Sequence, residues 1–165
     1  MDPKLEMLRH TVATLAYRAG KALRGAPPHF AAYCPDDSGR TPAAILAHMG
    51  DLFDWALSLA NGKQRWHDST PQPWDHEVAR FFAALEKFDH RLASGESLHE
   101  TPEKLFQGPV ADALTHTGQI AMLRRLAGCH IAGENYHVAE ITVGRVGVDV
   151  IWFDVQLADA PSGWA

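Results

Sequence analysis

The chain of 165 residues is 46% hydrophobic and 21% charged, as expected for one globular domain with a substantial core. Its formal net charge of −5 argues against non-specific nucleic-acid binding, which requires a basic surface. No apolar run reaches about 18 residues and the first residues lack an apolar leader core, so we expect no membrane span and no secretory signal. With only Cys34 and Cys129, we expect no disulfide framework and a cytoplasmic location.

Apolar residues recur at the helical period in four segments. Asp2 followed by Pro3 is a typical start for the first segment, because a capping carboxylate precedes a proline in the first turn. Thr41 and Pro42 start the second segment in the same way. Glycines follow the segments and favour helix ends. The predicted helices span residues 3–24, 41–60, 75–93 and 108–128.

The connections between these segments are rich in proline, glycine and polar residues, which indicates loops. The loop over residues 96–107 is expected to contain one short turn near Pro102 to Leu105. Residues 141–157 are rich in valine, isoleucine and aromatic residues, and they either pair as short strands or lie extended across the bundle. Residues 158–165 are expected to form a frayed tail. We therefore predict an all-α four-helix bundle with an irregular C-terminal extension, as a single domain over residues 1–165.

The fourth predicted helix carries the most specific polar pattern. Gly108 is expected at its cap and Pro109 in its first turn. Asp112 and His116 are four residues apart, so both lie on one face of the helix, with Gln119 close to that face. A buried carboxylate and imidazole need partners, and a metal ion satisfies both. Asp112 can instead be a first-turn carboxylate that interacts favourably with the helix dipole.

Two stretches of the sequence resemble a known family. His48 lies in TPAAILAHMGDLFDW, and His116 lies in ALTHTGQIAMLRRLAG, which GENYHVAEITVGRVG follows. Together these stretches resemble the DinB-like (DinB/YfiT) metal-binding four-helix bundles, over residues 3–145. The resemblance implies an up-down-down-up bundle with a divalent ion, most often zinc or nickel, near one end. It also implies chemistry of the kind found in relatives that are transferases and isomerases using a low-molecular-weight thiol, although other relatives have no known activity.

The family's metal ligands are one histidine from the second helix and two histidines, four residues apart, from the fourth. His48 matches the first and His116 the last, whereas Asp112 stands where the family has its middle histidine. Aspartate is a competent ligand, and two histidines with one carboxylate leave coordination positions open. Gln119 is expected to orient a ligand, and Asp51 to approach the rim of the same site.

Two classes of function follow from this site. The first is a metal-dependent enzyme, either a hydrolase using metal-bound water or a thiol-dependent transferase with a small-molecule substrate and a thiol cosubstrate. The second is a non-catalytic metal- or ligand-binding bundle that acts as a stress-related or scaffold homodimer. No motif distinguishes hydrolysis from thiol transfer, and no catalytic residue beyond the ligands is predicted.

The other candidate residues have simpler explanations. We expect the two arginines near the end of the fourth helix to be solvated and the two cysteines to be buried small hydrophobic residues. The three tryptophans of the second helix and the loop after it are interpreted as packing residues, or as the lining of a pocket beside the metal. Loop hydrogen bonding is expected for a second group of acidic and histidine residues after the fourth helix, made of His130, Glu134 and His137. The arginines are Arg124 and Arg125, the cysteines are Cys34 and Cys129, and the tryptophans are Trp55, Trp66 and Trp74.

Overall fold

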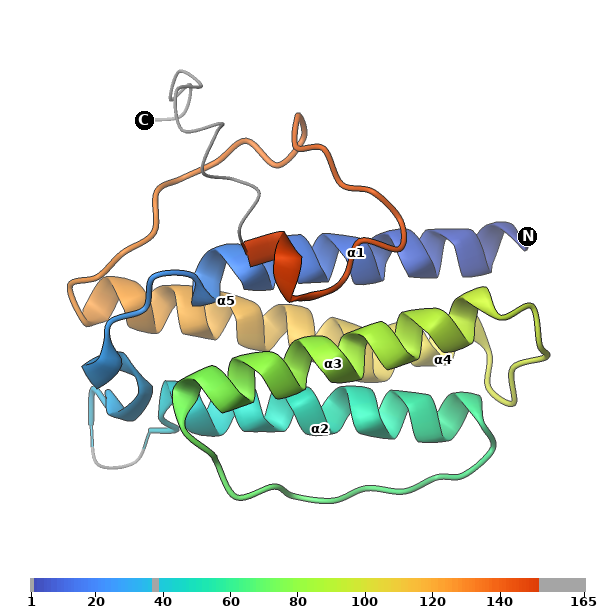
Figure 1. Cartoon of the computed structure of the whole chain (residues 1–165), viewed down its shortest axis with the longest axis horizontal. Helices are drawn as coiled ribbons and strands as arrows, with labels where there is room; N and C mark the ends of the chain where they lie inside the picture. Colours follow the sequence, from blue (N-terminus) through green and yellow to red (C-terminus); the bar gives the residue numbers. More distant parts are fainter. Residues whose placement is uncertain (1, 37–38, 152–165) are drawn as a thin grey trace.

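Four long helices pack into a bundle in the computed structural model, which describes residues 2–36 and 39–151 (Figure 1). The predicted all-α four-helix fold is confirmed. The long helices are α1 (Pro3–Leu23), α2 (Pro42–Ala60), α3 (Trp74–Ala93) and α5 (Ala111–Leu126). The shorter elements are η1 (Pro28–Ala32), α4 (Pro102–Leu105), the π-helical turn η2 (Phe106–Val110) and η3 (Val148–Ile151).

Side-chain caps fix where the helices begin. The Asp2 carboxylate accepts a hydrogen bond from the Lys4 backbone at 3.0 Å, and the Thr41 hydroxyl accepts one from Ala44 at 3.2 Å. Each cap satisfies a backbone N–H that has no partner within the helix. Gly62 follows the end of α2 with a φ of 70°, a conformation that a residue with a side chain rarely adopts. The caps read from the sequence at the start of α1 and α2 are therefore confirmed.

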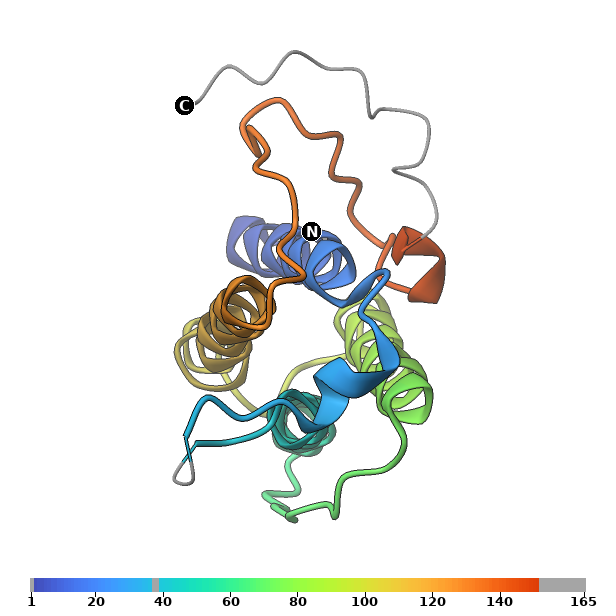
Figure 2. The same ribbon diagram turned by 90° about the vertical axis from the view of Figure 1, so that its left-hand side faces the viewer.

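Viewed along its length, the bundle has α1, α5, α2 and α3 in that order around its axis (Figure 2). The Arg80 guanidinium reaches the Ala47 carbonyl at 2.5 Å, and that of Arg91 reaches the Ala60 carbonyl at 3.3 Å, so α2 and α3 run in the same direction. Arg124 reaches the Ala22 carbonyl at 3.1 Å, where α1 and α5 both end. These two helices run opposite to α2 and α3 (Figure 1).

The core lies between the four helices and consists of alanine, leucine and phenylalanine side chains. The Phe53 ring packs against Phe81 and Phe88, with ring centroids 6.0 and 5.7 Å apart. All three rings are fully buried, and truncating such a ring costs about 3–5 kcal/mol. This packing holds α2 rigidly against α3, and α2 supplies one residue of the predicted metal site.

The fourth long helix does not begin where the sequence indicates. Helical structure starts at Pro102, capped by Thr101, and continues through η2 into α5. The prediction that Gly108 caps the helix and that Pro109 lies in its first turn is therefore wrong, since Pro109 is inside the helical run. The π turn widens the backbone here, which accommodates a proline that lacks its N–H. Asp112 consequently does not lie at a free helix end, so the dipole explanation for this residue loses its basis.

The segment after α5 crosses the outside of α1 and returns to the bundle at η3 (Figures 1 and 2). Glu134 accepts a hydrogen bond from the Tyr17 hydroxyl at 2.5 Å and pairs with Lys21, both on α1. Val146 is buried. No strand forms in the described part of residues 141–157, so the predicted strand pairing is not found there. The path is irregular rather than extended, with a turn at Val143 and Gly144 and the 3-10 helix η3 over Val148–Ile151, and residues 152–157 lie outside the described residues. The predicted tail over residues 158–165 lies outside the described residues.

Candidate metal centre

His48 on α2 meets Asp112 and His116 on α5 where these two helices pack together. Nε2 of His48 lies 3.3 Å from one oxygen of Asp112, and Nε2 of His116 lies 3.4 Å from the other. The two imidazole rings are 4.8 Å apart and nearly perpendicular. One ligand atom from each residue falls within 4.8 Å of the other two. The structure therefore brings together the three predicted ligands from two helices, with His48 lying 64 residues before Asp112 in the sequence.

Burial increases from one side of this group to the other. The His116 side chain is 11% exposed and that of His48 21%, whereas Asp112 is 45% exposed. The imidazoles therefore lie against the bundle, and the carboxylate faces solvent. An ion held by the three would have protein on one side and an accessible side on the other, as in catalytic zinc sites.

Gln119 contacts the ring of His116 on the side away from Asp112. Its Oε1 lies 2.7 Å from Nδ1 of His116, one helical turn away. A carboxamide oxygen only accepts hydrogen bonds, and the neutral tautomer that donates this bond from Nδ1 keeps a lone pair on Nε2. That lone pair is the one directed at the site, which is the tautomer that a metal ligand needs. The role predicted for Gln119, orienting a ligand, agrees with this contact.

The distances among His48, Asp112 and His116, which we call the triad, are longer than those of strong hydrogen bonds. A charge-assisted N–H to carboxylate hydrogen bond is about 2.7–2.9 Å long. The two imidazole-to-Asp112 distances, 3.3 and 3.4 Å, are longer, and they end on different oxygens of the carboxylate. Ligand atoms of the three residues all lie within 4.8 Å of one another, so the group could hold a metal ion. The nitrogen and oxygen donors present are also those that zinc and nickel accept.

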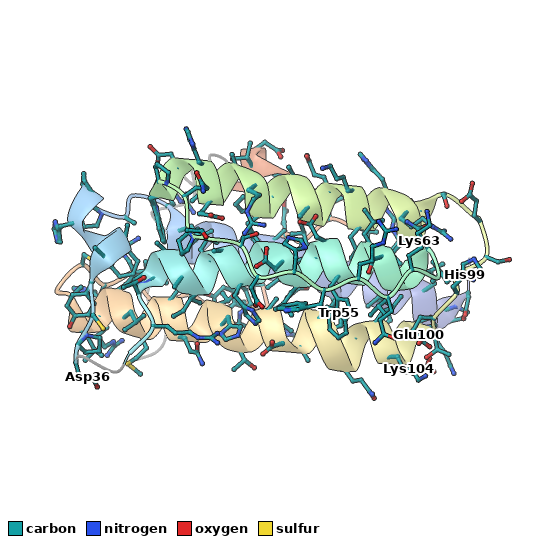
Figure 3. The ribbon with its side chains drawn as sticks, turned by 90° about the horizontal axis from the view of Figure 1, so that it is seen from below. Asp36, Trp55, Lys63, His99, Glu100 and Lys104 are labelled. Carbon is teal, nitrogen blue, oxygen red and sulfur yellow. The ribbon has the colours of Figure 1, made fainter. Side chains whose placement is uncertain are left out.

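Two tryptophans, Trp55 and Trp66, lie in contact with each other beside the triad. The Trp66 ring lies 5.5 Å from the His48 ring and 5.9 Å from Trp55, edge to face in both cases. Trp55 lies between α2 and α5 (Figure 3). Trp66 belongs to the loop over residues 61–73, which runs back along α2, and it remains 45% exposed. From the sequence, these tryptophans were expected either to pack in the bundle or to line a pocket beside the metal. In the structure, Trp66 lies next to the candidate metal centre.

A second group of potential ligands, Asp51, Asp54 and His67, lies further round α2. Asp51 was expected at the rim of the first site, but it turns toward α3 and is buried there. Its carboxylate accepts hydrogen bonds from the Ser69 backbone at 2.8 Å, the Ser69 hydroxyl at 2.6 Å and Arg80 at 2.9 Å, and Nε2 of His67 lies 3.1 Å away. Protein donors therefore already occupy most of the acceptor capacity of this carboxylate, three of them on Oδ1 and one on Oδ2.

Arg80 supplies the positive charge of this second group. Burial lowers the pKa of its guanidinium, but hydrogen bonds to Glu77 and Asp51 outweigh burial and raise that pKa above its usual value. The charge is therefore permanent. Gly50 leaves space for the Arg80 guanidinium, because a Cβ at position 50 would lie 2.7 Å from Cζ of Arg80. We interpret the group as a structural anchor for the loop over residues 61–73.

Two further expectations need correction. Arg124 is not solvated but 5% exposed, and its guanidinium donates to the carbonyls of Ala22, Arg24 and Cys129 at 2.8–3.1 Å. It thereby satisfies carbonyl groups where α1 ends, which periodicity alone does not reveal. Cys34 is exposed rather than buried because it lies in the loop before α2.

Comparison of the chain with protein-family models, curated proteins and solved structures gives no significant match. The resemblance to DinB-like bundles therefore stays a prediction. Among the described residues, no helix has the length and apolar character needed to cross a membrane.

Proposed function

We propose that the chain is a metal-dependent enzyme whose divalent ion, zinc or nickel, is held by His48, Asp112 and His116. The observation that carries the proposal is that ligand atoms of the three residues all lie within 4.8 Å of one another, in a group that is open to solvent on its Asp112 side. Because the three residues leave coordination positions free, a substrate or water has access to the ion.

The three ligands and Gln119 would each have a separate role. His48 and His116 offer neutral nitrogen donors, and Asp112 offsets one unit of the ion's charge. Gln119 holds the proton of His116 on Nδ1, away from the ion. The ion itself would either lower the pKa of a bound water to about 7 or hold a thiol as its thiolate, which supports a hydrolase or a thiol-dependent transferase respectively.

The test is elemental analysis of the purified protein after dialysis against zinc or nickel. We expect about one ion per chain in the wild type and loss of that ion in both His116→Ala and Asp112→Ala. The matched control is His67→Ala, which removes a histidine of the second group, in the loop over residues 61–73, and leaves the three triad residues in place. Metal loss in His67→Ala alone, or a wild type that binds no ion, would contradict the proposal.

One observation favours the alternative, a non-catalytic scaffold. The two imidazoles and the carboxylate already lie close enough for weak polar contacts without an ion. If the wild type binds no metal and Asp112→Asn unfolds at a lower temperature, the triad is a structural contact between α2 and α5. Metal binding with an unaltered melting temperature for Asp112→Asn in the metal-free protein would instead support the enzyme.

A further inference from the structure

The loop over residues 61–73 is irregular, yet it is tied to α2 on both sides of Trp66. Before Trp66, the Arg65 backbone N–H donates to the Ser58 hydroxyl at 3.1 Å. After it, Nε2 of His67 lies 3.1 Å from Asp51, and Ser69 donates twice to the same carboxylate. Surface loops are ordinarily mobile, because ordering an exposed side chain costs conformational entropy and buries little surface.

The fixed side chain is an aromatic ring beside the candidate metal centre. The Trp66 ring contacts His48 edge to face, while 45% of the residue stays exposed. The backbone on both sides of Trp66 is held by contacts with Ser58 and Asp51, which lie outside the triad, so binding a ligand against the ring requires little further ordering of the loop. An exposed indole next to an accessible ion offers a flat apolar surface to whatever the ion holds.

From this geometry we propose that Trp66 is a specificity-determining residue that selects ligands with an aromatic or flat apolar group next to their metal-binding atoms. The inference rests on the proposed metal function of the triad. Trp55 supports the ring from behind, with centroids 5.9 Å apart, and Asp51 holds the loop that carries it. Trp66 acts on the ligand directly, whereas Asp51 is a positioning residue.

Two simple chelators test the proposal on the Co²⁺-loaded protein. Acetohydroxamate and benzohydroxamate bind a metal through the same two oxygens and differ in their methyl and phenyl groups. Their dissociation constants can be measured from the visible absorption of bound Co²⁺. We expect the preference of the wild type for benzohydroxamate over acetohydroxamate to fall about three- to tenfold in Trp66→Ala, since an aromatic pair contributes that much beyond burial. Trp66→Phe should keep most of the preference.

The matched control is Met7→Ala, which truncates an exposed apolar side chain on α1, away from where α2 and α5 pack together. It should leave the ratio of the two dissociation constants unchanged. A Trp66→Ala protein that binds Co²⁺ and keeps the wild-type ratio overturns this proposal while leaving the metal site intact. A wild type that shows no Co²⁺ absorption overturns the proposed metal function, and this inference with it.

Discussion

Oε1 of Gln119 lies 2.7 Å from Nδ1 of His116, while the other nitrogen of the same ring faces Asp112 at 3.4 Å. The imidazole is therefore held between a neutral acceptor and a carboxylate. The tautomer that donates to this acceptor carries its proton on Nδ1, which leaves Nε2 available for the proposed metal ion.

Removing this acceptor should weaken metal binding without abolishing it. For Gln119→Ala we expect the affinity for zinc to fall about 10- to 100-fold, because the ring loses the contact that fixes its tautomer and orientation. Competition with a chromophoric chelator measures the change. Met122→Ala, an exposed truncation three residues further along α5, is the control and should bind zinc as the wild type does. Equal affinity in the two variants would mean that Gln119 does not orient His116.

The two adjacent arginines at the end of α5 should differ sharply in their effect on stability. Arg124→Met removes a buried guanidinium that donates to backbone carbonyls of Ala22, Arg24 and Cys129, and should lower the free energy of unfolding by about 2–3 kcal/mol. Arg125→Met changes an exposed residue and should alter it by less than about 0.5 kcal/mol. Urea unfolding measures both. Similar values for the two would show that the carbonyl contacts of Arg124 contribute little.

The anchor of the loop over residues 61–73 should depend on Asp51 and not on Asp54. Asp51→Asn places an amide donor against Arg80 and Ser69, which are themselves donors, and should cost about 2–3 kcal/mol of stability since Arg80 is only partly exposed. Asp54 is more exposed and its contacts with His67 and Arg80 are longer, 3.6 and 3.8 Å, so Asp54→Asn should cost at most about 1 kcal/mol.

Hydrogen exchange adds a local measurement to this pair. The Ser69 amide donates to Asp51, so it should exchange faster in Asp51→Asn than in Asp54→Asn. If the Ser69 amide exchanges equally in the two variants, the carboxylate of Asp51 does not hold the loop. In that case the fixed position of Trp66 would need another explanation.

The sequence predicted those features that depend on contacts between a side chain and the backbone close to it in the sequence. Asp2 and Thr41 predict the helix starts because each satisfies a local N–H, and Asp112 and His116 could be paired because residues four apart share a helix face. His48 joined this pair only through the resemblance to DinB-like bundles. The position of Trp66 could not be predicted in this way. It depends on contacts between a loop and Asp51, whose direction on α2 is set by Arg80 of α3. Such contacts join separate elements and leave no periodic pattern.

Replacing the unusual ligand of the triad should alter which metal the site prefers. Asp112→His creates the three-histidine set that the resemblance to DinB-like bundles implies, and it exchanges a charged oxygen donor for a neutral nitrogen donor. Nickel and zinc suit imidazole ligands, whereas manganese favours carboxylates, so the ratio of Mn²⁺ to Ni²⁺ dissociation constants should rise about tenfold or more. Titration of each ion into the wild type and the variant measures this ratio. An unchanged ratio, with metal still bound, would mean that Asp112 does not coordinate and that its contacts with His48 and His116 only position the two imidazoles.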